Sequence, residues 1–440
     1  PGEMAALQAY LAGVQGDVPR TIALCRQASE SLPEEKWFSR SFVALSLGIA
    51  HHASGQPAAA AEELREAIAL SRTTGPSHLM LAAMMELGHV QQMAGSLHQA
   101  AQTFREALEL APRRDVRPLP VAGMGYVGLA QVQYEWNDLD SALRSAREGI
   151  ELTELGGFAS YLLSGCARLA EVSLARGDMM GASQALEKAE RLAQQYHYPH
   201  MAGVLAKLHI RFWLAQGNLS AASQWLREHP SRPGDEIDLA QEAEQLAVAR
   251  VLLALDQPAK AQPSLSRLRE LAEQAGRMQS LIEILGLEAR AFQLQVDAYN
   301  ALSSLERALS LPQPEGYVRS FVDGGQPMAE LLSQILEAQR NGRRAVRQGI
   351  SPDYVSRLLA ASGTSAPPTS PTPQTLVEPL PGREFEILRL IAAGFSNQEI
   401  AQELVIALST VKSHINHIYG KLDAKSRTQA LGVAHALDLL

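Results

Sequence analysis

A pattern of small and apolar positions recurs about every forty residues through roughly residues 5–312. In each copy a turn residue is followed five positions later by a small residue and nine positions later by an apolar one. Positions five and nine lie one turn apart on the same helix face, so the small residue lets two helices approach closely and the apolar residue fills the space behind them. Each copy is therefore predicted to be a helical hairpin.

Eight copies of this pattern follow one another along the chain. The turn residues are Gly16, Gly55, Gly95, Asn137, Gly177, Gly217, Asp256 and Val296. The residues at position five are Thr21, Ala60, Ala100, Ala142, Ala182, Ala222, Ala261 and Ala301. The residues at position nine are Cys25, Leu64, Phe104, Ala146, Leu186, Leu226, Leu265 and Leu305. Because a lone hairpin cannot bury its apolar faces, we expect about eight hairpins to stack into a right-handed superhelix, an all-α solenoid.

The second and third copies resemble the tetratricopeptide repeat. The residues that carry the resemblance are Leu47, Gly48, Gly55, Ala60, Leu87, Gly88, Gly95, Ala100 and Phe104. The period here is about forty residues, against roughly thirty-four in that family, which predicts longer helices or longer connecting turns. The resemblance implies a superhelical sensor domain over residues 1–315.

In tetratricopeptide units the residue six positions before the turn lines the concave groove, and in this chain five successive copies place polar residues there. These residues are Gln131, Glu171, Arg211, Arg250 and Arg290. If unpaired, three arginines about 10 Å apart would form a positive trough suited to carboxylate or phosphate. Two interpretations stay open: a groove for an anionic ligand or acidic peptide, or a solvated polar row in which Arg211 merely pairs with Glu171.

The composition and motifs give no sign of catalysis, metal binding or a membrane span. Aromatic residues make up 5% of the chain, two cysteines cannot form a disulfide framework, and no apolar run is long enough to cross a bilayer. His197 and His200 lack an evident third metal ligand, and neither a phosphate-binding glycine loop nor a nucleophile motif occurs. We therefore predict a cytoplasmic protein that is not an enzyme and holds no metal or cofactor.

The repeat ends before residues 316–361, which are predicted to form a helical connector. A helical pattern runs from Gly325 through Ala338, and a second short helix is expected around Tyr354. Residues 362–379 are rich in Pro, Ser and Thr and have too little apolar surface to offset chain entropy, so they are predicted to be a flexible linker.

Residues 380–440 carry a second, shorter helical pattern. A helix from Arg383 is expected to end at Gly394, and Ser396 with Glu399 forms a capping box that opens a second helix. A third helix is predicted from about Ser409, and a fourth after Ser426. Two short helices around a tight turn, followed by a longer one, are typical of a helix-turn-helix DNA-binding domain.

The net charge of the chain is −8, which at first argues against nucleic acid, but the last sixty residues are neutral and the excess acid lies outside them. In the third helix, Val411, Ile415 and Ile418 face the core, so Lys412 and Asn416 face outward. Lys and Asn read guanine and adenine edges, while a helix N-terminus and basic residues bind phosphates. The predicted DNA-binding residues are Ser409, Thr410, Lys412, Ser413, Asn416, Lys421, Lys425 and Arg427.

These last residues resemble the LuxR-type DNA-binding domain. The matching segments are 380–384, 394–401, 410–414, 418–422 and 427–430. In that family the residues matching Lys412, Ser413 and Asn416 approach bases, and those matching Thr410, Lys421 and Arg427 approach phosphates or brace the fold. Two positions depart from the family pattern: Pro381 and Ala407 stand where a Ser or Thr usually caps a helix, and a lost cap costs about 1 kcal/mol.

A helical-hairpin solenoid followed by this domain resembles the large, ATP-dependent MalT-like regulators. Residues 214–219, 225–226 and 354–361 also resemble that group. Its members carry an N-terminal ATPase module, which this chain lacks; it begins at Pro1, so we expect the C-terminal portion of such a regulator or a shortened relative. ATP is thus implied for the full-length family only.

The resemblance also implies partners. It predicts a bacterial activator in which an inducer binds the solenoid, the protein self-associates, and the terminal domains bind double-stranded promoter DNA and recruit RNA polymerase. The alternative is a protein-binding tetratricopeptide scaffold whose terminal domain has lost DNA binding. The outward Lys412 and Asn416 favour the regulator.

Overall fold

A computed structural model describes most of the chain. The described residues are 2–14, 16–72, 77–111, 113–114, 117–198, 201–229, 238–341, 350–363, 382–392, 395–404 and 406–421. They belong to two compact units, Pro1–Thr364 and Ser365–Leu440. Among the described helices, none is both long and apolar enough to cross a bilayer.

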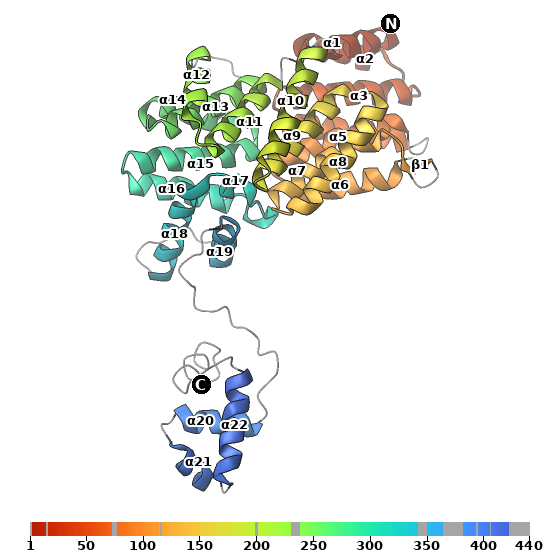
Figure 1. The fold of residues 1–440 in the computed structure, drawn as a ribbon. Coiled ribbons are helices and arrows are strands. Elements are labelled where there is room, and N and C mark those ends of the chain that lie inside the picture. The colour runs from red at the N-terminus through yellow and green to blue at the C-terminus, as the bar shows by residue number, and fades with distance from the viewer. Residues whose placement is uncertain are drawn as a thin grey trace. The chain divides into compact units, whose positions relative to one another are not determined.

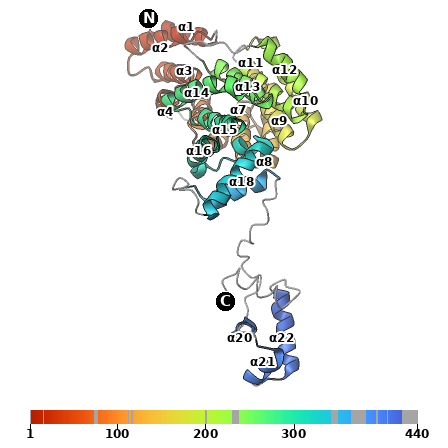
Figure 2. The ribbon, with the colours of Figure 1, turned by 90° about the vertical axis from the view of Figure 1, so that its left-hand side faces the viewer.

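The first unit is an array of helical hairpins stacked in chain order (Figures 1 and 2). Within the described residues there are eight, as predicted. The first four hairpins are α1 (Gly2–Val14) with α2 (Val18–Ser31), α3 (Trp37–Ala53) with α4 (Pro57–Ser71), α5 (His78–Met93) with α6 (Leu97–Leu110), and α7 (Ala122–Glu135) with α8 (Leu139–Gly156). The last four are α9 (Ala159–Ala175) with α10 (Met179–Tyr196), α11 (Ala202–Ala215) with α12 (Leu219–Glu228), α13 (Leu239–Ala254) with α14 (Pro258–Ala275), and α15 (Met278–Leu294) with α16 (Ala298–Ser310).

The eight predicted turn residues all adopt the left-handed backbone conformation, with φ between 55° and 85°. Glycine favours this conformation because it has no Cβ, and Asn137 and Asp256 tolerate it because short polar side chains can hydrogen-bond locally. Val296 at φ 61° has neither advantage. The sequence pattern therefore identified the turns correctly, including those without glycine.

The predicted small and apolar positions form the core between the helices. All eight residues at position five are at most 2% exposed. Seven of the eight at position nine are at most 3% exposed, and Leu226 on α12 is the half-buried exception. Phe104 lies so close to Gly88 and Gly128 that a Cβ on either glycine would come within 2.4 Å of its ring. Close helix contact thus depends on small residues, as the pattern predicted.

A short strand pair lies in the connection between α6 and α7. β1 (Arg113–Arg114) and β2 (Arg117–Pro118) are antiparallel, with Arg113 opposite Pro118 and Arg114 opposite Arg117. These four residues are the only strand residues in the described part of the chain. The prediction of an all-α fold is confirmed, since this strand pair lies within a loop and takes no part in the packing of the hairpins described above.

The end of the array returns to contact its fourth hairpin. Trp136 Nε1 donates to the Glu315 carbonyl oxygen at 2.9 Å, and the Val318 N–H donates to the Glu135 carbonyl oxygen at 2.7 Å. Ser320 donates from both its N–H and its hydroxyl to the Glu135 carboxylate. These partners are 179 to 185 residues apart in sequence, so the segment after the eighth hairpin packs against the fourth hairpin in the middle of the array.

Residues after the eighth hairpin complete this contact. The elements are the 3₁₀ turn η3 (Gln313–Glu315), α17 (Arg319–Val322), α18 (Gly325–Asn341) and α19 (Pro352–Ala361). α17 packs between α15 and α7 (Figure 1), and the Tyr354 hydroxyl of α19 donates to the Tyr317 carbonyl at 2.6 Å. The predicted connector helices are present, and they pack against the array within the same unit.

The second unit contains three described helices, α20 (Gly382–Ala392), α21 (Asn397–Glu403) and α22 (Leu408–Lys421). Their core consists of Ile387, Leu388, Ile391, Ile400, Val411, Ile415 and Ile418. The predicted capping box is formed: the Glu399 N–H donates to the Ser396 hydroxyl, and the Ser396 N–H donates to the Glu399 carboxylate. The predicted fourth helix, and the linker apart from Ser362 and Gly363, lie outside the described residues.

Candidate DNA interface and ligand groove

The buried face of α22 decides which of its residues face solvent. Val411 and Ile418 are fully buried and Ile415 is 6% exposed, as the apolar spacing predicted. Since residues along a helix advance by about 100°, Lys412 and Ser413, directly after Val411, turn away from the core and are exposed. α22 is thus held by one apolar stripe against α20 and α21, and its opposite face is open.

Four of the predicted DNA-binding residues lie on that open face. Ser409, Thr410, Lys412 and Ser413 are all exposed. Ser409 and Thr410 are in the first turn of α22, where the positive end of the helix dipole favours an anion such as phosphate. Lys412 and Ser413 follow on the same half of the helix. The arrangement therefore offers a phosphate-binding end next to side chains that can reach base edges.

Of the other four predicted DNA-binding residues, the structure describes the side chain of Lys421 only. Asn416 belongs to α22, but its side chain lies outside the described part. Lys425 and Arg427 also lie outside the described residues. Lys421 donates to the Glu384 carboxylate at 3.0 Å, and Glu384 is 5% exposed. Of the two roles that the resemblance left open for Lys421, this ion pair favours bracing α22 against α20.

Arg383 has a bracing role that the sequence reasoning missed. Its guanidinium donates to the Leu404 carbonyl oxygen at 2.8 Å and also pairs with Glu386 at 2.7 Å. Leu404 directly follows α21, so this bond satisfies one of the carbonyls that every helix end leaves without an internal partner. A basic residue 21 positions before the carbonyl that it contacts gives no sequence signal for such a contact.

The start of α22 has the weak cap that the sequence predicted. Ala407 precedes the helix, and its carbonyl oxygen accepts the Thr410 N–H at 2.9 Å and the Val411 N–H at 3.2 Å. Its methyl side chain cannot accept the further N–H bond that a Ser or Thr side chain would take.

In the solenoid, the Arg211 guanidinium lies in a buried network. It donates to the Glu171 carboxylate at 3.3 Å and the Tyr134 hydroxyl at 2.6 Å, and it pairs with Asp323 beside α17. Arg168 supplies a second guanidinium to Glu171 and also contacts Gln131. The groove positions Gln131, Glu171 and Arg211 are therefore joined to one another, and Asp323 ties them to the segment after the eighth hairpin.

The other two groove arginines are also paired. Arg250 donates to the Glu283 carboxylate at 2.9 Å, and Lys207 donates to its other oxygen at 2.7 Å. Burial by itself would raise the pKa of Glu283, but these two cations outweigh it and lower that pKa to about 2. Arg290 donates to the Gln293 side chain at 2.8 Å.

The expectation of three unpaired guanidinium groups is therefore wrong. Low-dielectric surroundings make an unpaired buried charge costly, so the fold supplies a carboxylate or an amide to each arginine. The sequence spacing brought Gln131, Glu171 and Arg211 together, as expected for neighbouring copies of the repeat. The spacing could not show that Asp323 pairs with Arg211 or that Glu283 pairs with Arg250. The observed Arg211–Glu171 pair is the contact that the alternative interpretation named.

An α-solenoid of tetratricopeptide-like hairpins and a helix-turn-helix unit with an exposed polar helix define a class of proteins that join a binding solenoid to a DNA-binding domain. The family follows from sequence comparison: the chain belongs to the family with the MalT-like TPR region, whose model matches residues 2–339. Residues 378–434 match the bacterial regulatory proteins of the luxR family.

Individual relatives agree with this family. The chain is 28% identical to the HTH-type transcriptional regulator MalT of Serratia proteamaculans (strain 568) over 457 residues, which cover 99% of this chain and 49% of the relative. The protein of the same name from Yersinia pestis (strain Pestoides F) gives the same identity and coverage. The chain thus spans about half the length of these curated relatives. Among solved structures, the apo form of RapI matches with a TM-score of 0.42 and 12% identity, covering 67% of this chain and 98% of RapI.

Proposed function

We propose that this chain is a DNA-binding transcriptional regulator that reads duplex DNA with α22. The observation that carries the proposal is the division of α22 into a buried apolar face, with Val411 and Ile418, and an exposed face with Lys412 and Ser413. The luxR family match over residues 378–434 supports the same role. In this arrangement the first turn of α22 takes a phosphate and Lys412 reaches into the major groove.

The role of the solenoid is part of the same proposal. An effector binds the hairpin array, the protein self-associates, and paired terminal domains gain affinity for repeated promoter sites through effective concentration. Recruitment of RNA polymerase by the bound domains completes an activator that works in the bacterial cytoplasm. The names of the MalT relatives support regulation of transcription, and these further steps rest on the resemblance.

Cofactor use by this chain stays a prediction. The sequence contains no glycine loop of the G-x-x-x-x-G-K-[ST] type. No step of the proposed mechanism passes through a nucleotide. The ATPase activity that the resemblance implies belongs to a module outside these residues.

The test is a mobility-shift assay of the full chain on genomic fragments of the source bacterium, followed by measurement of the best site. Lys412→Ala should lose about 1–3 kcal/mol on that site and relax its sequence preference. The matched control is Lys260→Ala, which removes an exposed lysine from α14 and should leave binding unchanged.

Two outcomes would contradict the proposal in different ways. Full binding and full specificity in Lys412→Ala would show that α22 does not dock as proposed. No shift with any fragment at low salt, where phosphate contacts are strongest, would favour the scaffold alternative.

A further inference from the structure

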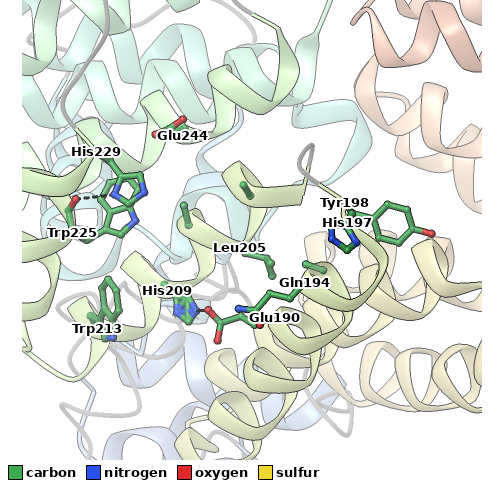
Figure 3. Close-up of a pocket in the computed structure, with 13 residues that line it drawn as sticks. Glu190, Gln194, His197, Tyr198, Leu205, His209, Trp213, Trp225, His229 and Glu244 are labelled. Carbon is green, nitrogen blue, oxygen red and sulfur yellow. Dashed lines mark hydrogen bonds and ion pairs between the residues drawn. The ribbon is translucent and has the colours of Figure 1, made fainter. Parts of the chain in front are cut away.

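A cavity of about 750 Å³ opens between α10, α11, α12 and α13, away from the groove described above. Figure 3 shows Trp213, Trp225 and His229 on one side, Glu190 beside His209, and Tyr198 on the opposite side. His209 and Trp213 are each two positions from Arg211 on α11. Since two positions correspond to about 200° around a helix, they face away from the groove side where Arg211 lies.

The cavity lies where the sixth hairpin departs from the repeat. α12 has 10 residues, whereas the equivalent helices α10 and α14 on either side have 18 each. Leu226 on this short helix is half-buried, although the equivalent residue is buried in the other seven hairpins. Among the described residues, the sides of α10 and α11 next to α12 line the cavity.

The charged side chains of the cavity are acidic. Glu190 and Glu244 line it, and no Lys or Arg is among the described residues that do so. Glu190 accepts a hydrogen bond from His209 Nε2 at 2.6 Å. Burial lowers the pKa of His209, which keeps this imidazole neutral and leaves the carboxylate charge uncompensated. Burial, and then the neighbouring Glu187, raises the pKa of Glu190, as expected for a carboxyl group without a cationic partner.

Aromatic rings form a large part of the cavity wall. Trp225 and His229 are stacked with centroids 4.5 Å apart and planes at 10°, and Trp213 lies 5.3 Å from His209. The face of an indole carries negative electrostatic potential and attracts ammonium and guanidinium groups. The same rings are partly packed on the core of the sixth and seventh hairpins, so they are held in place before any ligand arrives.

We propose that this cavity binds an organic cation, an amine or a guanidinium compound of modest size. Glu190 and Glu244 compensate its charge, and Trp213 and Trp225 contact its apolar part. The volume lies within the range of small-molecule sites. The proposal stands apart from DNA binding, because the site belongs to the first unit and its occupation is measured without DNA.

The experiment compares butylguanidinium with butylurea, which has nearly the same shape but no charge, by calorimetry on the full chain. Butylguanidinium should bind in the millimolar range expected for so small a ligand, and binding should weaken as salt is raised. Glu244→Gln should lower its affinity about tenfold. The control Glu109→Gln removes an exposed carboxylate of α6 that does not line the cavity, and it should change affinity little.

Several results would overturn the proposal. One is binding of butylurea or a neutral monosaccharide as tight as that of butylguanidinium, because the cavity would then not select charge. Another is an unchanged affinity in Glu244→Gln, and a third is no saturable binding of butylguanidinium at about 10 mM. Circular dichroism of each variant shows whether the helices are intact. Lys412→Ala should bind the cation normally, which separates this site from the DNA proposal.

Discussion

At the scale of single residues, the turn at Val296 stores backbone strain. Val296 is the only β-branched residue with positive φ in the described chain, and its side chain is 90% exposed, so it gains little packing in return. A left-handed conformation costs an L-residue roughly 1–2 kcal/mol, and branching at Cβ raises that cost. The hairpin of α15 and α16 forms despite this turn because the buried helix faces outweigh it.

Val296→Gly should therefore stabilise the chain by about 0.5–1 kcal/mol, since relief of strain exceeds the extra entropy that glycine gives the unfolded state. The matched control is Gly177→Val, at φ 77° with nothing within 4 Å of an added Cβ, which should destabilise by about 1–2 kcal/mol through the backbone alone. Urea unfolding followed by circular dichroism measures both. A loss of stability in Val296→Gly would contradict the strain argument.

At the scale of elements, the two helix starts in the helix-turn-helix unit differ in their caps. α21 begins with a complete capping box, while α22 follows Ala407, which has no side-chain acceptor. The helix that carries Lys412 is thus the one with the weaker start. Its position depends on the buried stripe and on the Lys421–Glu384 pair at its far end.

Ala407→Ser should add a side-chain acceptor at the start of α22, within reach of the Ser409 N–H, and stabilise α22 by about 1 kcal/mol. The expected observation is slower amide hydrogen exchange in the first turn of α22, by roughly fivefold. Ser396→Ala is the reciprocal control, because it removes the existing cap of α21 and should accelerate exchange there by a similar factor. Unchanged exchange in Ala407→Ser would mean that tertiary packing alone fixes this helix start.

At the scale of the whole solenoid unit, the contact between the fourth hairpin and the segment after the eighth buries a carboxylate, that of Glu135. Glu135 is 5% exposed and accepts two hydrogen bonds from Ser320. Burial, assisted by the nearby charges of Asp323 and Glu171, raises its pKa to about 7, although the Ser320 bonds oppose the rise. A carboxyl group whose pKa is higher in the folded than in the unfolded state contributes stability at low pH and loses it as pH rises through the folded value.

The contribution of Glu135 to the free energy of unfolding should thus decline between about pH 5 and pH 8. Glu135→Gln keeps the acceptor oxygen but not the titration, so it should be more stable than wild type at pH 8, by about 1–3 kcal/mol, and the advantage should shrink at pH 5. Urea unfolding at both pH values measures the difference. Glu283→Gln is the control of opposite sign: it should lower the free energy of unfolding at both pH values, because the low pKa of Glu283 means that its charge is stabilising at both. A pH-independent difference for Glu135→Gln would contradict this account.

The sequence by itself determined the elements and the units. A repeat of turn, small and apolar positions located eight hairpins, because each hairpin meets the same local requirements of a left-handed turn and close helix contact. The capping box of α21 and the buried face of α22 also depend only on residues a few positions apart, so the spacing of residue types predicted them. The exposed positions of Lys412 and Ser413 followed from that spacing.

Tertiary structure alone decided which residues far apart in the sequence contact one another. The contacts of Arg211 with Asp323 and of Arg250 with Glu283 join segments 112 and 33 residues apart, and they give partners to arginines that were expected to be unpaired. The contacts of Glu135 with the segment after the eighth hairpin and the cavity beside the shortened α12 also lie outside any repeat pattern. The physical reason is that helix formation and turns depend on neighbours within a few positions, whereas the partner of a buried charge depends on how many hairpins complete one turn of the superhelix.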